Sequence, residues 1–241
     1  LRRWHHDATH MAQLPIDTHL DACATTIAER NLVVVAEPGA GKTTRLPLHL
    51  AGLNGDGHPP RRVLVLEPRR IAARVAARHI SRRLGESVGG RVGYEVRFDR
   101  ARSRDTRLTF MTEGLFVRSL GNPRRLDSVD VVIFDELHER HLDADYALAR
   151  VRHLQQTSLP SLRIVAMSAT MDPDPVANLL DAKVMHIEGR QHPVDLHHRR
   201  GHTSAAAPRC WDLGPLNVAL RRMSGAARRR GRRRRSRQQH R

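Results

Sequence analysis

Short apolar runs alternate with amphipathic stretches over most of this chain. Apolar residues at helical spacing predict helices over residues 17–29, 42–51, 71–84, 113–120, 143–154 and 175–180. Runs rich in β-branched residues predict strands over residues 32–35, 63–66, 91–98, 108–111, 129–134, 163–167 and 184–187. Strands that alternate with helices in this way indicate an α/β domain with crossover connections.

Two of the predicted strands contain a run of four consecutive apolar residues. Residues 32–35 read Leu-Val-Val-Val, and residues 131–134 read Val-Val-Ile-Phe. A strand that alternates polar and apolar residues has one face in water, whereas a wholly apolar strand is buried on both faces. We therefore expect a mostly parallel sheet that is covered by helices on both faces.

Outside this pattern lie an N-terminal lead and an arginine-rich C-terminal segment. We expect residues 1–13 to be unstructured, residues 14–198 to form the domain and residues 199–241 to form a disordered tail. Translation in the wrong frame, or truncation of the gene, would explain why the hydrophobic pattern stops there. Reading the coding DNA in the other two frames would decide this.

The net charge of +17 is concentrated in that C-terminal segment. Residues 199–241 hold 14 arginines and one acid, a net charge of +13, which leaves +4 for residues 1–198. A polyanionic partner is therefore indicated less strongly than the total implies. No apolar run is long enough to span a membrane, and two distant cysteines are typical of a reducing cytoplasm.

A phosphate-binding loop is the clearest local motif. Residues 36–44 read Ala-Glu-Pro-Gly-Ala-Gly-Lys-Thr-Thr, directly after the apolar strand 32–35 and before a predicted helix. Glycines allow backbone N–H groups to converge on an anion, and the helix N-terminus adds partial positive charge. We predict that this loop binds the phosphates of a nucleotide through Gly39, Ala40, Gly41, Lys42, Thr43 and Thr44.

Two details of the loop bear on this interpretation. Ala36 stands where the motif usually has glycine, so a ligand-free glycine turn is the alternative. Lys42 is one of only two lysines among 42 basic residues, the other being Lys183. A compact ammonium suits a phosphate loop better than a planar guanidinium, which explains a lysine in so arginine-rich a chain. Thr43 places a hydroxyl where Mg²⁺ accompanies the phosphates.

Two acidic residues, Asp135 and Glu136, follow the buried strand 131–134. Ligands of open α/β sheets bind at the carboxyl ends of the strands, so these side chains are expected near the phosphate loop. One carboxylate, Asp135, then holds Mg²⁺ together with Thr43, and Glu136 is the catalytic group that activates water, with Lys42 as the second catalytic residue. Without the loop, an Asp-Glu pair after a strand would usually mark a helix N-terminus.

Six motifs in order resemble those of the DExH/DEAH-box helicases of superfamily 2. Besides the phosphate loop they are Leu66-Glu67-Pro68-Arg69-Arg70, Gly93-Tyr94-Glu95-Val96-Arg97-Phe98, Thr112-Glu113-Gly114, Asp135-Glu136-Leu137-His138 and Ser168-Ala169-Thr170. Leu137 replaces the alanine of the DEAH form. The resemblance covers residues 14–198 and is greatest to the bacterial HrpB-type branch.

The resemblance implies a RecA-like ATPase domain that couples ATP hydrolysis to remodelling of single-stranded RNA or DNA, without sequence preference. It implies nucleic-acid contacts by Arg69, Arg70, Thr112 and Gly114, and coupling between nucleotide and nucleic acid by His138, Ser168 and Thr170. It also implies a second RecA-like domain, in cis or in trans, that supplies an arginine finger. No motif of that second domain is found in this sequence.

Other interpretations remain open on the sequence alone. The chain is then a P-loop NTPase that does not use nucleic acid, or a non-enzymatic protein that binds nucleic acid through its tail. Arg69 and Arg70 would instead be a solvated helix start, and Ser168 and Thr170 a helix cap. The sixteen histidines show no metal-ligand spacing, so pairs such as His5-His6 and His197-His198 are expected to be surface residues.

Overall fold

The computed structural model describes residues 13–55, 57–122 and 124–189. Residues 1–12 of the predicted lead, the whole predicted tail and the last part of the predicted domain lie outside the described residues. A 3₁₀ turn over Pro15–His19 precedes the first helix. The helices are α1 (Leu20–Glu29), α2 (Lys42–Leu50), α3 (Arg70–Arg83), α4 (Glu113–Ser119), α5 (Leu142–Thr157) and α6 (Asp174–Leu180). The strands are β1 (Asn31–Ala36), β2 (Val63–Glu67), β3 (Val92–Val96), β4 (Asp99–Ala101), β5 (Leu108–Thr112), β6 (Val131–Phe134), β7 (Arg163–Ser168) and β8 (Ala182–Ile187).

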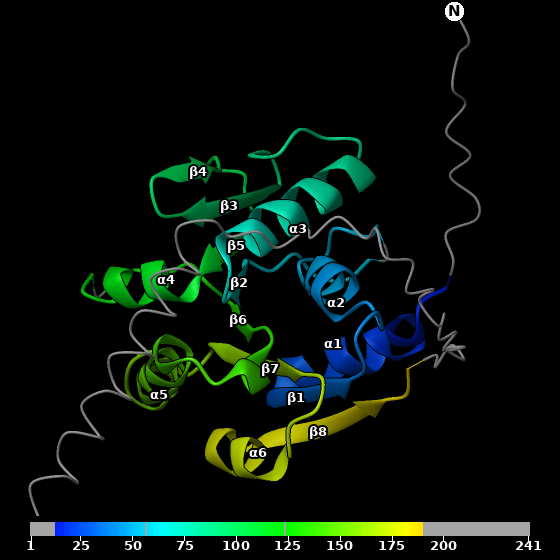
Figure 1. Ribbon diagram of the computed structural model, residues 1–241, viewed down its shortest axis with the longest axis vertical. Coiled ribbons are helices and arrows are strands. Elements are labelled where there is room, and N and C mark those ends of the chain that lie inside the picture. The colour runs from blue at the N-terminus through cyan, green and yellow to red at the C-terminus, as the bar shows by residue number, and fades with distance from the viewer. Residues whose placement is uncertain (1–12, 56, 123, 190–241) are drawn as a thin grey trace, which may run out of the picture. The chain divides into compact units, whose positions relative to one another are not determined.

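The strands form one sheet in the order β4-β3-β5-β2-β6-β7-β1-β8 (Figure 1). Every neighbouring pair is parallel except β3 and β4, which form an antiparallel hairpin at one edge. This confirms the expected mostly parallel α/β sheet. Because the strands are parallel, the loops that follow β1, β2, β5, β6 and β7 all emerge at the same edge of the sheet.

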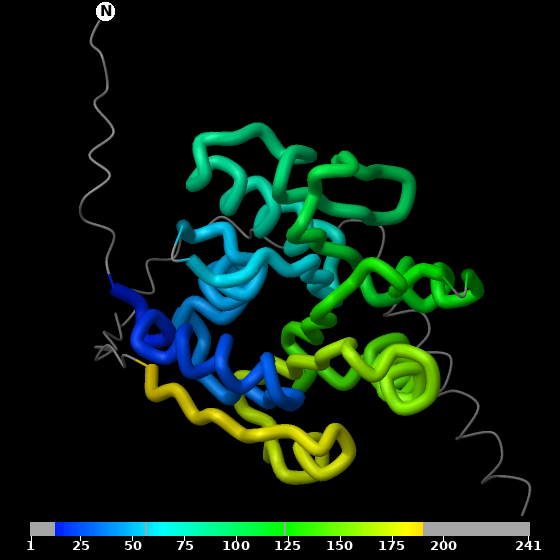
Figure 2. The backbone as a smooth tube through the Cα atoms, turned by 180° about the vertical axis from the view of Figure 1, so that it is seen from behind, coloured from blue at the N-terminus to red at the C-terminus, as the bar shows by residue number. Residues whose placement is uncertain are grey.

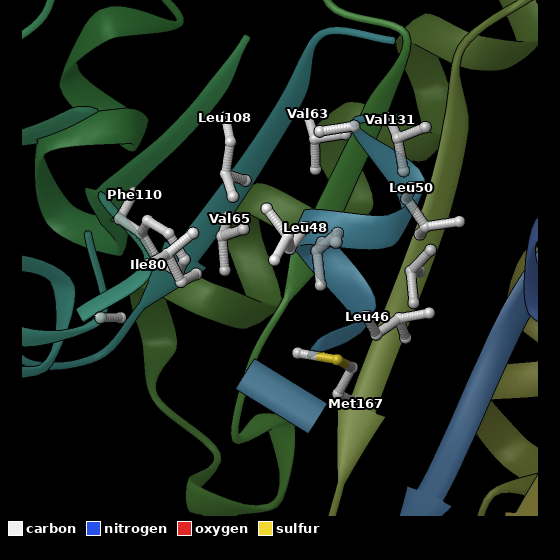
Figure 3. Close-up of a cluster of buried hydrophobic side chains, with 14 of the residues drawn as sticks. Leu46, Leu48, Leu50, Val63, Val65, Ile80, Leu108, Phe110, Val131 and Met167 are labelled. Atoms are coloured by element: carbon white, nitrogen blue, oxygen red, sulfur yellow. The ribbon is translucent and has the colours of Figure 1, made fainter. Parts of the chain in front are cut away.

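Helices cover both faces of the sheet, as the wholly apolar strands predicted. One hydrophobic core contains residues of α1, α2 and α3, and the other contains residues of α4, α5 and α6. Figures 1 and 2 show the two groups of helices from opposite sides. On the first face, Leu46, Leu48 and Leu50 of α2 pack against strand residues such as Val65 and Val131 (Figure 3). Alternate residues of each strand therefore face opposite cores.

The predicted strand over 91–98 is the clearest difference from the expected elements. The structure ends β3 at Val96, turns at Phe98 with φ 66° and returns as the short strand β4. Asp99, Arg100 and Ala101 carry no hydrophobic alternation, so this edge strand could not be predicted from the pattern. Among the described residues, no helix is both long and apolar enough to cross a membrane.

Candidate functional site

The phosphate loop lies between the end of β1 and the start of α2. Gly39 and Gly41 have φ values of 83° and 98°, a left-handed backbone that other residues rarely adopt. A Cβ atom on Gly41 would lie 2.8 Å from Leu14 Cδ1 and 2.9 Å from Ile16 Cγ2, so this close approach also requires glycine. The Ile16 amide donates to the Ala40 carbonyl at 3.2 Å. The segment before α1 therefore packs against the loop and fixes its shape.

Lys42 is the first residue of α2, and its side chain turns back into the loop. It is only 5% exposed, and its Nζ donates to the carbonyls of Ala36 and, at 3.2 Å, Glu37. Burial lowers the pKa of the Lys42 ammonium, while the nearby carboxylates of Glu136 and Asp135 act in the opposite direction. The predicted cation thus lies within the concave loop, at a helix N-terminus that itself attracts anions.

Thr43 and Asp135 meet across the sheet edge although 92 residues separate them. The Thr43 hydroxyl donates to Asp135 Oδ2 at 2.5 Å, and the Glu136 amide donates to Asp135 Oδ1 at 2.9 Å. Asp135 is 1% exposed, and this burial is the main cause that raises its pKa to about 6. A carboxylate and a hydroxyl are hard oxygen donors, and their placement beside the phosphate loop fits Mg²⁺.

Glu67, at the end of β2, is a member of this centre that the sequence analysis did not identify. It is 2% exposed, and its carboxyl is a neighbour of Asp135, the residue that follows the adjacent strand β6. Burial, and then the nearby charge of Asp135, raises the pKa of Glu67 to about 9. The available signal was its position, since an acidic residue ended a wholly apolar strand beside the strand that leads into Asp135.

Glu136, the predicted catalytic carboxylate, begins a short 3₁₀ turn over Leu137–Glu139. Its backbone has φ 51°, and its Oε2 lies 3.4 Å from His138 Nδ1. The same imidazole nitrogen lies 3.5 Å from the Ala169 amide, which follows β7. The predicted coupling residue His138 therefore lies between Glu136 and the segment that follows β7.

The other two predicted coupling residues differ in their surroundings. Ser168 is fully buried, and its hydroxyl accepts a hydrogen bond from the Met171 amide at 3.1 Å. This contact closes a turn after β7 and does not cap a helix, because α6 begins only at Asp174. Thr170, by contrast, is exposed.

A groove of about 240 Å³ lies farther along the same sheet edge, where β2 and β5 end. It brings together three of the predicted nucleic-acid residues, Arg70, Thr112 and Gly114. Arg97 and Arg118 also line it and were missed, since isolated arginines carry little signal in an arginine-rich chain. Asp143 closes one side, and a Cβ atom on Gly114 would lie 2.8 Å from Asp143 Oδ2.

Arg69 is the predicted nucleic-acid residue that does not line this groove. Its Nη2 donates to Glu139 Oε1 at 2.8 Å, and Glu139 belongs to the turn that begins at Glu136. The Arg69 side chain is 71% exposed. The ion pair joins the segment after β2 to the segment after β6, between the two parts of the site.

Comparison with known proteins places the chain in a family. The model of the DEAD/DEAH box helicase family matches residues 17–179. The ATP-dependent RNA helicase HrpB of Escherichia coli is 39% identical over 190 residues, which cover 77% of this chain and 23% of the relative. The ATP-dependent RNA helicase DHX33 of Drosophila melanogaster is 37% identical over 72% of this chain and 25% of the relative.

Solved structures agree with the sequence comparison. The crystal structure of Escherichia coli DEAH/RHA helicase HrpB superposes with a TM-score of 0.69 and 38% identity, covering 76% of this chain and 23% of that one. The chain thus spans about a quarter of the length of the relatives it matches. The expected family and the RecA-like fold are confirmed: the chain belongs to the DEAD/DEAH box helicases.

Proposed function

We propose that this chain is the first RecA-like, ATP-binding domain of an ATP-dependent RNA helicase. The observation that carries the proposal is the contact of 2.5 Å between Thr43 and Asp135 beside the buried Lys42. It joins the phosphate loop to the acidic end of β6, which is the arrangement that nucleotide binding with Mg²⁺ requires. The arginine-lined groove on the same edge of the sheet is the site that we propose for RNA.

In the proposed binding mode, the triphosphate lies on the loop 39–44. The first N–H groups of α2 have no intrahelical partners, so they are available to the phosphates together with the helix dipole. Lys42 exchanges its contacts with the Ala36 and Glu37 carbonyls for phosphate oxygens. Thr43 and Asp135 would hold Mg²⁺, which supplies positive charge against the phosphate oxygens when it is bound.

For hydrolysis, we assign Glu136 the role of orienting the attacking water and accepting its proton. The left-handed backbone at Glu136 begins the turn that carries both its side chain and His138. His138 lies between Glu136 and the Ala169 amide. A movement of the segment after β7 would therefore displace His138 and, through it, the carboxylate of Glu136. This supports a coupling role for His138 and for the loop around Ser168 and Thr170.

RNA is the nucleic acid that we assign to the groove, since the relatives named above are RNA helicases. Arg70, Arg97 and Arg118 provide positive charge for a sugar-phosphate backbone. Phe98 is 89% exposed, and the Arg97 guanidinium lies 4.7 Å from its ring centroid. An exposed aromatic ring beside cations suits a single strand, because every base can stack on it irrespective of sequence.

We further propose that efficient turnover requires a second RecA-like domain, in the same polypeptide or in another chain. An arginine finger in comparable NTPases is worth about 10³–10⁵ in rate, and a rigid scaffold must aim it.

We place the protein in the cytoplasm. Cys23 is buried with its pKa raised to about 12, so it is not an available thiolate.

Steady-state ATPase and strand-separation assays, with and without single-stranded RNA, test the proposal. We expect measurable MgATP binding that RNA strengthens, with turnover far below about one per second and no unwinding. Fast turnover together with strand separation would refute the need for a second domain. MgATP binding that RNA leaves unchanged would instead favour a P-loop NTPase that does not use nucleic acid.

A further inference from the structure

A cluster of two histidines and an aspartate lies outside the nucleotide site. Asp21 is in the first turn of α1, His49 is in the last turn of α2, and His58 is in the connection between α2 and β2. One potential ligand atom from each residue lies within 4.8 Å of the other two. Seven residues of helix separate His49 from Lys42, which corresponds to about 10 Å along α2.

The end of α2 brings His58 back toward His49. Gly52 donates to the His49 carbonyl at 2.9 Å and Leu53 donates to the Leu48 carbonyl at 3.2 Å, which is the Schellman pattern of a helix that ends at glycine. Gly52 has φ 63°, and a Cβ atom there would lie 2.9 Å from the His58 carbonyl oxygen. The chain therefore folds closely over the helix end, and the two imidazole rings meet edge to face with centroids 4.5 Å apart.

Both imidazoles direct a nitrogen at the same carboxylate oxygen. His49 Nε2 lies 3.4 Å from Asp21 Oδ1, and His58 Nε2 lies 3.2 Å from the same atom. Around a tetrahedral Zn²⁺ ion with bonds of about 2.0–2.1 Å, neighbouring ligand atoms are about 3.3 Å apart. Two of the three edges of the cluster already have this length, so little movement separates the cluster from zinc geometry.

We propose that Asp21, His49 and His58 form a Zn²⁺ site that ties α1 to the end of α2. Two imidazoles and one carboxylate are ligands that suit zinc and neighbouring divalent metals, whereas Mg²⁺ prefers oxygen ligands alone. A water molecule completes the tetrahedron. Zinc can enter from solvent, because the side chains of Asp21 and His58 are 86% and 27% exposed.

Asn54 supports this assignment from behind His49. Its side-chain amide nitrogen lies 3.3 Å from His49 Nδ1. A histidine that binds zinc through Nε2 carries its proton on Nδ1 and usually donates it to an oxygen. Rotation of the Asn54 amide by half a turn exchanges its nitrogen and oxygen, and its Oδ1 then accepts that proton. Asn54 would thereby hold the His49 imidazole in the orientation that binds zinc.

The histidine spacing in the sequence did not reveal this site. Asp21, His49 and His58 are separated by 28 and 9 positions, which match no zinc motif. Only the packing of α1 beside α2, and the return of the chain at Gly52, brings the three residues together. The expectation that the histidines bind no metal therefore rested on sequence spacing alone.

Titration of the full chain with Co²⁺, followed by visible absorption, tests the proposal in a buffer that contains Mg²⁺. We expect one Co²⁺ per chain, with the intense bands of tetrahedral coordination, and full displacement by Zn²⁺. Asp21→Asn and His58→Gln should each weaken binding at least about tenfold, because even outer-shell changes cost about 10- to 100-fold. Zn²⁺ should also raise the melting temperature of the native chain, and not that of either variant.

Two control variants remove histidines elsewhere. His79→Gln changes an exposed residue of α3, and the double change His197→Gln/His198→Gln removes a pair outside the described residues. Both controls should keep the tetrahedral bands at native affinity. Bands that persist in Asp21→Asn or His58→Gln, bands lost in a control, or weak octahedral absorption throughout would overturn the proposal. In that case the three residues form only an ion-paired cluster.

Discussion

The proposed nucleotide centre and the proposed nucleic-acid groove share one edge of the sheet but are built in opposite ways. Lys42, Glu67 and Asp135 are at most 5% exposed, and burial shifts the pKa of each. The groove is lined by the arginines Arg70, Arg97 and Arg118, together with Pro68, Thr112, Gly114, Leu115 and Asp143. All three arginines are exposed.

This difference follows from the ligand that we propose for each region. A phosphate chain with Mg²⁺ occupies one position, and charges that act on it in a poorly solvated centre are strong and hard to replace. A sugar-phosphate backbone is long and repetitive, so several exposed arginines each contribute a small part of the binding free energy. Water and salt weaken each of these contacts. We therefore expect single substitutions to be severe at the centre and mild in the groove.

The largest effect is expected at Lys42. Lys42→Ala removes charge-assisted hydrogen bonds to the phosphates worth about 3 kcal/mol, so MgATP affinity should fall about 100-fold without unfolding of the chain. Titration with a fluorescent ATP analogue measures this. Lys183→Ala is the matched control, because Lys183 is the only other lysine and lies exposed on β8. Equal losses in both variants would show that general positive charge, and not the loop, binds the nucleotide.

The next effect concerns pH and Glu67. Its pKa of about 9 lies above the ordinary value of 4.5, so folding favours its protonated form, and this stability is lost as pH rises through about 9. Without Mg²⁺, the melting temperature should fall from pH 6 to pH 9 by about 5 °C, or roughly 2 kcal/mol. Glu67→Gln should flatten this profile. A variant profile as steep as the native one would place the titration elsewhere.

Wholly apolar strands made the fold predictable. Leu32, Val33 and Val34 are fully buried in β1. The strand predicted over residues 129–134 is found as β6, Val131–Phe134, which begins two residues later than predicted. Burial on both faces leaves a continuous apolar run, which survives in the sequence as a direct signal. The edge strand β4 has no such requirement, because its three residues are intermediate or exposed.

Site residues that belong to a recognisable sequence motif could be predicted. Residues that join the site only through tertiary packing could not. The loop glycines and Asp135 follow strands in recognisable order, so their meeting at one edge could be inferred. Glu67 depends on strand order, because β2 had to be the neighbour of β6 before its carboxyl reached Asp135. Arg118 depends on the direction of one exposed face of α4, which arginine content cannot indicate.

A smaller effect is expected for the groove arginines. Arg118→Ala should weaken binding of single-stranded RNA about threefold to fivefold and reduce the salt slope by about 0.7, the value of one phosphate contact. Filter binding or fluorescence anisotropy at several salt concentrations measures both quantities. The control is Arg150→Ala, which changes an exposed residue of α5 that does not line the groove. It should alter neither the RNA affinity nor the salt slope. A salt slope that is identical in both variants would remove Arg118 from the interface.

The smallest effect on stability is expected at Gly114. The Cβ atom of Gly114→Ala would lie 2.8 Å from Asp143 Oδ2, which is the end of a flexible side chain and can move aside. The melting temperature should therefore change by no more than about 2 °C. RNA affinity should fall, because the displaced carboxylate and the new methyl group narrow the groove. Unchanged RNA affinity would show that the backbone of the nucleic acid does not approach this position.

The Mg²⁺ dependence of ATP binding tests the central claim most directly. ATP affinity is measured by calorimetry with Mg²⁺ and with EDTA, for the native chain, Asp135→Asn and the exposed control Asp127→Asn. Asp135 is expected to bind Mg²⁺ together with Thr43, so Mg²⁺ should strengthen ATP binding at least about tenfold in the native chain and the control. In Asp135→Asn the gain should be no more than about twofold. An undiminished Mg²⁺ effect in Asp135→Asn would contradict the account.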